Sequence, residues 1–395
     1  MHDIVAVGDV HEGINFGFQI DPETGLSARV LDIHENFART AKFAIAKKAS
    51  LFVILGDLFD RTHVSPIFRE MIRRDVMDPL KEACIPVWIL AGNHDQPRGK
   101  KGTSIDDFRG YPNVSVYKKP TVETLEIDGK SVGCIIVPYM HPTHIAELVL
   151  ENFGKETPIE QTFVLGQELL KKWVQKRSNE LDADFKLLFA HYYVEGARLR
   201  ETSSPNVLPG EFSFRKDMIP DVDLAVFGHI HLHQKMQVRG TEVLYCGAVD
   251  RIDWGEREDK KGFIVISPFA EKKWRFEELP TRDMLKINVE ASNDNPLQKI
   301  LDAIPDVTGK MVRLEIAIDE GLRNKVLDSM IADKLKDAFH YEIRWTERTE
   351  EKIGFVSFTM DPFKLLRDFV DLNYCDHSKH KELKRMGESL LKEVL

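Results

Sequence analysis

The chain has 395 residues with 43% hydrophobic and 30% charged residues, and its formal net charge is −9. This composition is typical of a globular protein, and the length allows a large core and more than one domain. The negative charge argues against a protein that binds nucleic acid through bulk positive charge, although metal ions or small basic patches can supply positive charge locally. The four cysteines form no C-x-x-C pair, so we expect free thiols. Without a signal peptide or a membrane-length apolar run, we expect a cytoplasmic protein with no membrane contact.

Strands that alternate with helices fill the first part of the sequence. Residues 4–7, 51–55 and 87–91 are short apolar runs, which are typical of buried strands. Residues 29–48 have apolar side chains at helical spacing, and Ser65-Pro66 predicts the start of a helix that continues towards Glu82. This alternation predicts parallel strands covered by helices.

From about residue 111 the sequence becomes richer in strands. We expect strands at residues 114–116, 122–127, 131–137, 184–191 and 224–227, four more between residues 234 and 278, and a helix at residues 158–177. Asp128-Gly129 predicts a tight hairpin turn between two of these strands. The fold class is therefore α/β, and residues 1–279 are expected to form a two-sheet β-sandwich flanked by helices.

A domain boundary is expected at Pro280-Thr281-Arg282. Residues 280–358 have the order strand, helix, strand, helix, strand, at residues 285–289, 296–304, 312–318, 324–339 and 341–346. This order is typical of a small α+β domain. Residues 359–395 predict C-terminal helices, and the last helix has apolar side chains at helical spacing. That face either packs on the body of the protein or binds a helix of a partner.

Five of the apolar runs are each followed by side chains that bind metal ions. Because ligands of open α/β sheets bind beyond the carboxyl ends of the strands, we expect these side chains to lie close together. They are Asp9, His11, Asp57, Asn93, His191, His229 and His231. A set of Asp, Asn and His without Cys suits Mn²⁺, Fe²⁺ or Zn²⁺. Seven ligands are too many for one ion and fit two ions that share Asp57.

Two metal ions about 3.5–4 Å apart can bind both oxygens of a displacement at phosphorus and provide a hydroxide at neutral pH. His94 is expected to donate a proton to the leaving oxygen, although a histidine that only orients a ligand would look the same in sequence. We expect Asp60 to orient a ligand histidine rather than bind metal. Arg98, Lys100 and Lys101 follow closely, and they either contact a nucleic-acid backbone or form a solvated loop.

The motifs that carry these side chains resemble those of the calcineurin-like metallophosphoesterases. The motifs are Asp9-x-His11, Gly56-Asp57-x-x-Asp60, Gly92-Asn93-His94-Asp95, His191 and Gly228-His229-x-His231. The resemblance implies the fold of that family and a division of the ligands between two metal sites. One site would consist of Asp9, His11, Asp57 and His231, and the other of Asp57, Asn93, His191 and His229.

The sequence from Tyr245 to Glu256, followed by Lys260-Lys261-Gly262-Phe263, resembles the SbcD-type nucleases of DNA double-strand-break repair. This resemblance implies a Mn²⁺-dependent 3′–5′ exonuclease on duplex DNA and endonuclease on single strands. It also implies a homodimer and an SbcC-type, SMC-like ATPase partner. Residues 280–358 would be a capping and DNA-binding domain, and residues 359–395 would bind the ATPase.

Two alternatives to this function stay open. The first is a di-metal phosphodiesterase or phosphatase that acts on small nucleotides or phosphoproteins, which leaves the capping domain and the amphipathic last helix unexplained. The second is a scaffold without catalytic activity that binds DNA ends or the partner. The intact set of metal ligands argues against the scaffold.

Overall fold

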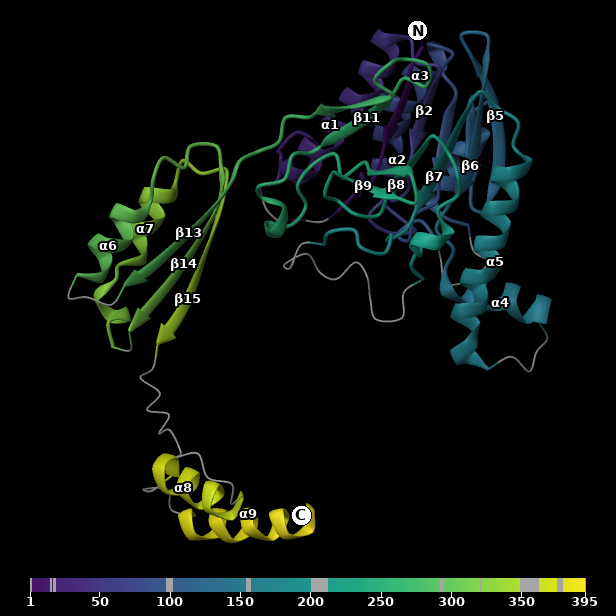
Figure 1. Cartoon of the computed structure of the whole chain (residues 1–395). Helices are drawn as coiled ribbons and strands as arrows, with labels where there is room; N and C mark the ends of the chain where they lie inside the picture. The colour runs from purple at the N-terminus through teal and green to yellow at the C-terminus, as the bar shows by residue number, and fades with distance from the viewer. Residues whose placement is uncertain are drawn as a thin grey trace. The chain divides into compact units, whose positions relative to one another are not determined.

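The computed structural model describes residues 2–14, 16, 19–96, 102–153, 158–199, 212–291, 295–319, 321–348, 362–374 and 379–394. The chain divides into two compact units, shown in Figure 1. The first contains Met1–Leu285, Thr308–Val312 and Ala338–His340, and the second contains Lys286–Val307, Arg313–Asp337 and Tyr341–Leu395. The division after Leu285 lies close to the boundary that the sequence suggests at residue 280. Within the described residues, no helix has both the length and the hydropathy of a membrane-spanning segment.

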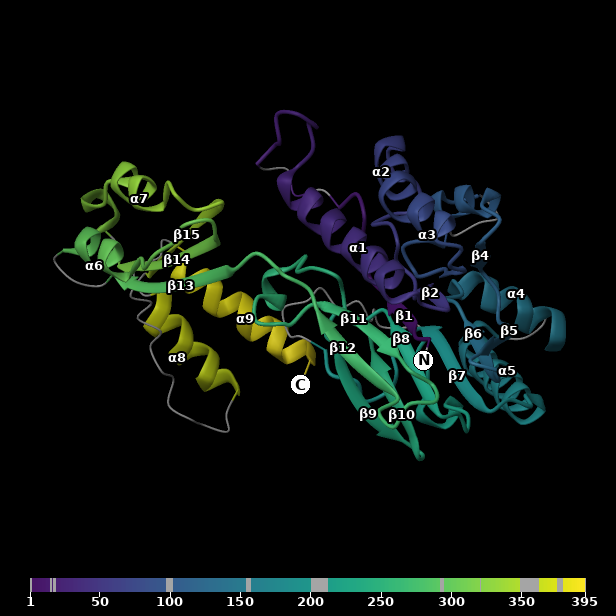
Figure 2. The same cartoon turned by 90° about the horizontal axis from the view of Figure 1, so that it is seen from above.

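One sheet of the first unit has the strand order β12-β11-β1-β2-β3-β4. Its strands are β1 (Ile4–Val7), β2 (Leu51–Ile54), β3 (Val87–Leu90), β4 (Val114–Tyr117), β11 (Gly262–Ile266) and β12 (Trp274–Glu278). Strands β1 to β4 pair in parallel, and β11 pairs antiparallel with β1. Helix α1 (Ala28–Lys47) connects β1 to β2 and contacts α3 (Asp78–Glu82), as Figure 2 shows. The helix predicted from Ser65-Pro66 is α2 (Pro66–Ile72), which continues through a π-helical turn, Arg73–Met77, into α3.

The second sheet has the strand order β5-β6-β7-β8-β10-β9. Its strands are β5 (Thr121–Ile127), β6 (Lys130–Val137), β7 (Phe185–His191), β8 (Leu224–Gly228), β9 (Gln234–Val238) and β10 (Thr241–Tyr245). Asp128 and Gly129 connect β5 to β6 with positive φ angles of 53° and 76°, as the predicted hairpin turn requires. Helix α5 (Ile159–Glu180) was predicted, whereas α4 (Pro142–Phe153) was not.

The two sheets pack face to face, and each is also covered by helices. In β6, Val132, Cys134 and Ile136 belong to the core between the sheets. The alternate residues Ile135 and Val137 pack in a second core that also contains side chains of α4 and α5. A strand buried on both faces needs apolar residues at successive positions, which explains its continuous apolar sequence. The predicted α/β sandwich flanked by helices is confirmed.

The second unit contains most of a sheet with the order β13-β14-β15. Its elements are β13 (Met284–Ala291), α6 (Pro296–Ala303), β14 (Met311–Asp319), α7 (Asp328–Leu335), β15 (His340–Arg348), α8 (Pro362–Tyr374) and α9 (His380–Val394). The helix expected at residues 324–339 was too long, because Arg323–Lys325 form a 3₁₀ turn and Leu327 is extended. At the C-terminal end of the expected helix, the Phe339 N–H donates to the Lys310 carbonyl at 2.9 Å. Phe339 is therefore hydrogen-bonded to the residue before β14 instead of to a helix.

Candidate metal centre

The polar residues at the carboxyl ends of β1, β2, β3, β7 and β8 meet at one edge of the sandwich. The loops after β1 and β2 are tied together, because the His11 N–H donates to the Asp57 carbonyl at 3.0 Å. Asp9, His11 and Asp57 have positive φ angles of 51°, 52° and 51°. This conformation is uncommon for residues other than glycine and is often found at functional sites.

The carboxylate and imidazole groups form three overlapping clusters. In each cluster the ligand atoms lie within 4.8 Å of one another. The clusters are Asp9, His11 and His231; His11, Asp57 and His94; and Asp57, His191 and His229. The side-chain oxygen of Asn93 joins the last cluster, at 3.0 Å from His191 Nε2 and 2.9 Å from His229 Nδ1. The structure thus brings together all seven residues predicted as ligands, with Asp57 between the two ends of the centre.

His191 has the hydrogen-bonding pattern of a metal ligand. Its Nδ1 atom donates to the Leu55 carbonyl at 2.6 Å, so in the neutral ring Nε2 carries the lone pair. Nε2 lies 3.0 Å from Asn93 Oδ1 and 3.3 Å from Asp57 Oδ2, which are both acceptors. In the neutral ring these are three electron-rich atoms without a donor, and either a proton on Nε2 or a metal ion must lie between them, so these residues fit a metal ion.

The other end of the centre gives the same result. His231 Nδ1 donates to Glu256 at 2.7 Å, and its Nε2 lies 3.0 Å from Nε2 of His11. The His11 Nδ1 atom is buried and has no hydrogen-bond partner among the described residues. Two imidazole nitrogens that face each other at this distance, beside Asp9, fit a second ion.

Burial and mutual charge shift the pKa values of these groups strongly. Burial disfavours the charged form of Asp57, but His191 and His94 outweigh it and hold the pKa of Asp57 well below its usual value. Burial likewise lowers the pKa of His229, to about 3. Burial also lowers the pKa of His191, yet Asp57 overrides this and raises it to about 9. A proton on His191 must therefore leave when this side chain binds a metal ion.

His94 is half-buried and is held by two hydrogen bonds. Its backbone N–H donates to Asp57 Oδ1 at 2.9 Å, and its Nδ1 donates to the Asp60 carbonyl at 2.6 Å. The Asp60 carboxylate lies 3.8 Å from Nδ1 of His11, beyond hydrogen-bonding distance. Asp60 therefore positions His94 through its main chain, and an orienting role of its carboxylate on a ligand histidine stays a prediction.

Two carboxylates at the centre, Asp95 and Glu256, lie in stretches noted in the sequence but were given no role there. Asp95 is buried and accepts hydrogen bonds from the backbone N–H groups of Gly92, Leu58 and Phe59, at 2.9, 3.4 and 3.4 Å. It joins the loop after β3 to the loop after β2. Glu256 accepts a hydrogen bond from His231. It ends the stretch from Tyr245 that resembles the nucleases, but the sequence indicated no role for it. Arg98, Lys100 and Lys101 lie outside the described residues, and their contact with nucleic acid stays a prediction.

A two-sheet α/β sandwich with this Asp, Asn and His centre at one edge has the architecture of a metallophosphoesterase. The sequence pattern of the calcineurin-like phosphoesterases matches residues 2–233. The chain belongs to this family, whose members use two divalent metal ions.

Three relatives of known description match the chain at low identity. It is 23% identical over 370 residues to the DNA double-strand break repair protein Mre11 of Archaeoglobus fulgidus. This match covers 87% of this chain and 77% of that protein. It is 22% identical to the SbcD component of the SbcCD nuclease of Staphylococcus epidermidis, over 56% of each chain. The corresponding protein of Bacillus subtilis is 20% identical, over 56% of this chain and 58% of that protein. The match thus spans little more than half the length of the two bacterial proteins.

Proposed function

We propose that this protein is a di-metal phosphodiesterase that hydrolyses DNA at double-strand breaks. The observation that carries the proposal is the convergence of seven candidate metal ligands, with Asp57 in two of the three clusters, beside the half-buried His94. The centre lies beyond the carboxyl ends of the strands, which is where ligands of α/β sheets bind.

Each part of the centre has a role in this reaction. Asp9, His11, Asp57 and His231 would hold one ion, and Asp57, Asn93, His191 and His229 would hold the other. The ions would stabilise charge at phosphorus and supply hydroxide. His94 donates a hydrogen bond from Nδ1 to the Asp60 carbonyl. Its Nε2 atom is therefore available to carry a proton to the leaving oxygen.

Three lines of support favour DNA as the substrate. The match to the Archaeoglobus repair protein extends over 370 residues and thus beyond the phosphoesterase pattern, which ends at residue 233. The two bacterial relatives are components of a nuclease. The stretch from Tyr245 to Glu256 also resembles nucleases of this type. By the same resemblance we propose Mn²⁺ as the metal, a homodimer as the active form and the cytoplasm as its location.

Helices α8 and α9 are the proposed binding site for an SMC-like ATPase. The two helices pack against each other, and the side chain of Leu366 in α8 lies 2.7 Å from where a Cβ atom on Gly387 of α9 would be. Apolar side chains remain exposed on the pair, among them Leu372, Met386 and Leu390 at 51%, 56% and 60%. An amphipathic helical pair of this kind fits the groove or the helices of a partner.

The test is the degradation of an end-labelled linear duplex by the purified protein with Mn²⁺, beside the His94→Ser variant. We expect cleavage that needs both the metal and His94, with a rate about 10²–10⁴-fold lower in the variant. His94→Ser should still bind the metal ions, because the seven ligands are unchanged. Cleavage of DNA by both proteins at the same rate would refute the role of His94.

The alternative function, hydrolysis of small phosphodiesters or phosphoproteins, uses the same centre. Bis-p-nitrophenyl phosphate distinguishes the two, because its hydrolysis needs the metal centre but no DNA contact. If this compound is hydrolysed while duplex and single-stranded DNA stay intact, with and without the ATPase partner, the alternative is correct.

A further inference from the structure

Glu256 contacts a candidate metal ligand but has no place among the ligands themselves. It is 2% exposed, and its Oε1 atom accepts a hydrogen bond from His231 Nδ1 at 2.7 Å. Glu256 lies in a short 3₁₀ turn, Trp254–Glu256, 25 residues after His231 in the sequence. The contact is therefore made by the tertiary fold.

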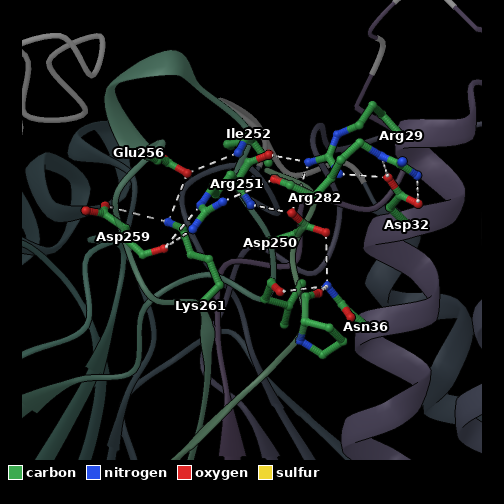
Figure 3. A network of polar contacts seen from close by, with 12 residues as sticks. Arg29, Asp32, Asn36, Asp250, Arg251, Ile252, Glu256, Asp259, Lys261 and Arg282 are labelled. Atoms are coloured by element: carbon green, nitrogen blue, oxygen red, sulfur yellow. Dashed lines mark hydrogen bonds and ion pairs between the residues drawn. The ribbon is translucent and has the colours of Figure 1, made fainter. Parts of the chain in front are cut away.

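The second carboxylate oxygen of Glu256 is also fixed. Oε2 accepts from the Ile252 N–H at 3.0 Å and lies 2.9 Å from the ammonium group of Lys261. The Lys261 side chain is fully buried, and its Nζ atom also donates to the His231 carbonyl at 2.9 Å. Figure 3 shows the contacts of Glu256 with Ile252 and with Lys261 as dashed lines. Lys261 thus holds both the carboxylate and the main chain of the histidine that this carboxylate contacts.

The loop that carries Glu256 is anchored to α1 by a separate buried ion pair. Asp250 accepts from the Arg29 guanidinium at 3.0 Å and from the Asn36 side chain at 3.0 Å. Arg251 donates from two nitrogens to the Asp259 carbonyl, which closes the loop on itself. Figure 3 shows this network beside Glu256. This anchor holds the loop against α1, whereas the Glu256 carboxylate itself is held by its own bonds to Ile252 and Lys261.

We propose that Glu256, fixed by Lys261, is a positioning residue that sets the tautomer and orientation of His231 for metal binding. A proton held at Nδ1 by a carboxylate leaves the lone pair on Nε2, which is the atom that faces His11 and the centre. The negative charge on Glu256 also makes Nε2 a stronger donor to a cation. The buried ammonium group of Lys261 balances that charge. The inference rests on the metal centre of the proposed function and does not depend on the substrate.

A purely structural role is the competing explanation, in which Glu256 and Lys261 only stabilise the loop. That role predicts a loss of stability without a specific loss of metal affinity. Asp250→Asn provides the matched control. Asp250 lies in the same loop as Glu256 and is also a buried carboxylate paired with a cation, Arg29 of α1. Asp250 contacts Arg29 and Asn36 but none of the seven candidate ligands in the hydrogen bonds described.

The experiment is calorimetric titration of the metal-free full-length chain with Mn²⁺, with electron paramagnetic resonance of the bound ions. In Glu256→Gln we expect one of the two binding steps to weaken by about 10–100-fold while the other is retained. The spin-coupled signal of the paired ions should then give way to that of a single ion at Mn²⁺ concentrations that fill both sites of the unchanged protein. Asp250→Asn should lower the unfolding temperature and leave both binding steps unchanged.

A second variant keeps the test valid if Glu256→Gln alone does not fold. In Glu256→Gln/Lys261→Met both buried charges are removed, and we expect the same loss of one binding step. Unchanged binding in these variants, or an equal loss in Asp250→Asn, would overturn the proposal. If the unchanged protein binds no Mn²⁺, the metal centre itself is wrong, whereas two binding steps without DNA cleavage would refute only the proposed substrate.

Discussion

Gly92→Ala is expected to disable the metal centre by displacing one side chain. Gly92 follows β3, and a Cβ atom built on it would lie 2.1 Å from Asp57 Oδ1 and 2.3 Å from the Asp57 nitrogen. Contacts between such atoms are normally about 3.5 Å or longer, so the two residues must separate by more than about 1 Å. Gly92 does not have a positive φ angle, so the backbone conformation itself accepts alanine. The effect therefore comes from the close approach of Asp57 rather than from backbone strain.

The size of the effect follows from the position of Asp57 between the two ends of the centre. A displacement of about 1 Å in a catalytic group typically lowers the rate by about 10²-fold. Because Asp57 would contribute to both ions, both metal affinities should fall as well. Overpacking at a buried site also costs about 1–3 kcal/mol of unfolding free energy, which a stable chain tolerates.

The assay is the Mn²⁺-dependent hydrolysis of bis-p-nitrophenyl phosphate, together with metal titration and urea unfolding. Gly110→Ala is the matched control, because Gly110 also lacks a positive φ angle and a Cβ atom there would meet nothing within 4 Å. We expect the control to keep full activity. Wild-type rate and metal affinity in Gly92→Ala would refute the reasoning that Asp57 is shared and cannot move.

Three further predictions concern stability, pH and partner binding. Phe52→Ala removes a fully buried ring whose centroid lies 6.3 Å from that of the Phe37 ring. Urea unfolding should show a loss of about 3–5 kcal/mol of unfolding free energy, and the folded protein should keep its metal affinity. Burial lowers the pKa of His34, but Glu12 and Asp75 raise it above its ordinary value, so its proton stabilises the folded state at low pH and is lost as the pH rises through the folded pKa. Relative to the unchanged protein, His34→Gln should therefore lose more unfolding free energy at about pH 6 than at about pH 9, and an equal loss at both would contradict this. Leu390→Asp should prevent co-purification with an SMC-like ATPase while hydrolysis of the small diester continues, and an unchanged complex would exclude α9 from the interface.

The convergence of the candidate ligands was predictable because each one is local to a strand end. A buried strand such as β1 is a short apolar run, and the polar residue after it is visible in the sequence without any knowledge of tertiary structure. Parallel neighbours place their carboxyl ends at the same edge, so Asp9 and Asp57 could be expected to meet. The hairpin at Asp128-Gly129 was predictable for the same reason, since the turn chemistry is contained in two residues.

The missed features depend on contacts between distant segments. Helix α4 is an exception, because Pro142 as its first residue is a common helix start that the sequence displays; its apolar side chains pack in the core beside α5. The helix at residues 324–339 ends early because of the sheet hydrogen bond at Phe339, which no local pattern reveals.

Glu256 shows why the positioning residues of such a centre are harder to find than its ligands. The candidate ligands of this centre all lie at or just after strand ends, whereas a residue that holds a ligand only needs to reach it from any segment. Glu256 reaches His231 because Lys261 holds both its carboxylate and the histidine main chain, while Asp250 only anchors the loop to α1. The same arrangement predicts how the parts fail: loss of a ligand should abolish an ion site, and loss of Glu256 should weaken one site and leave the other. Loss of Asp250 should cost stability alone, so the three kinds of substitution separate the chemistry of the centre from the scaffold that supports it.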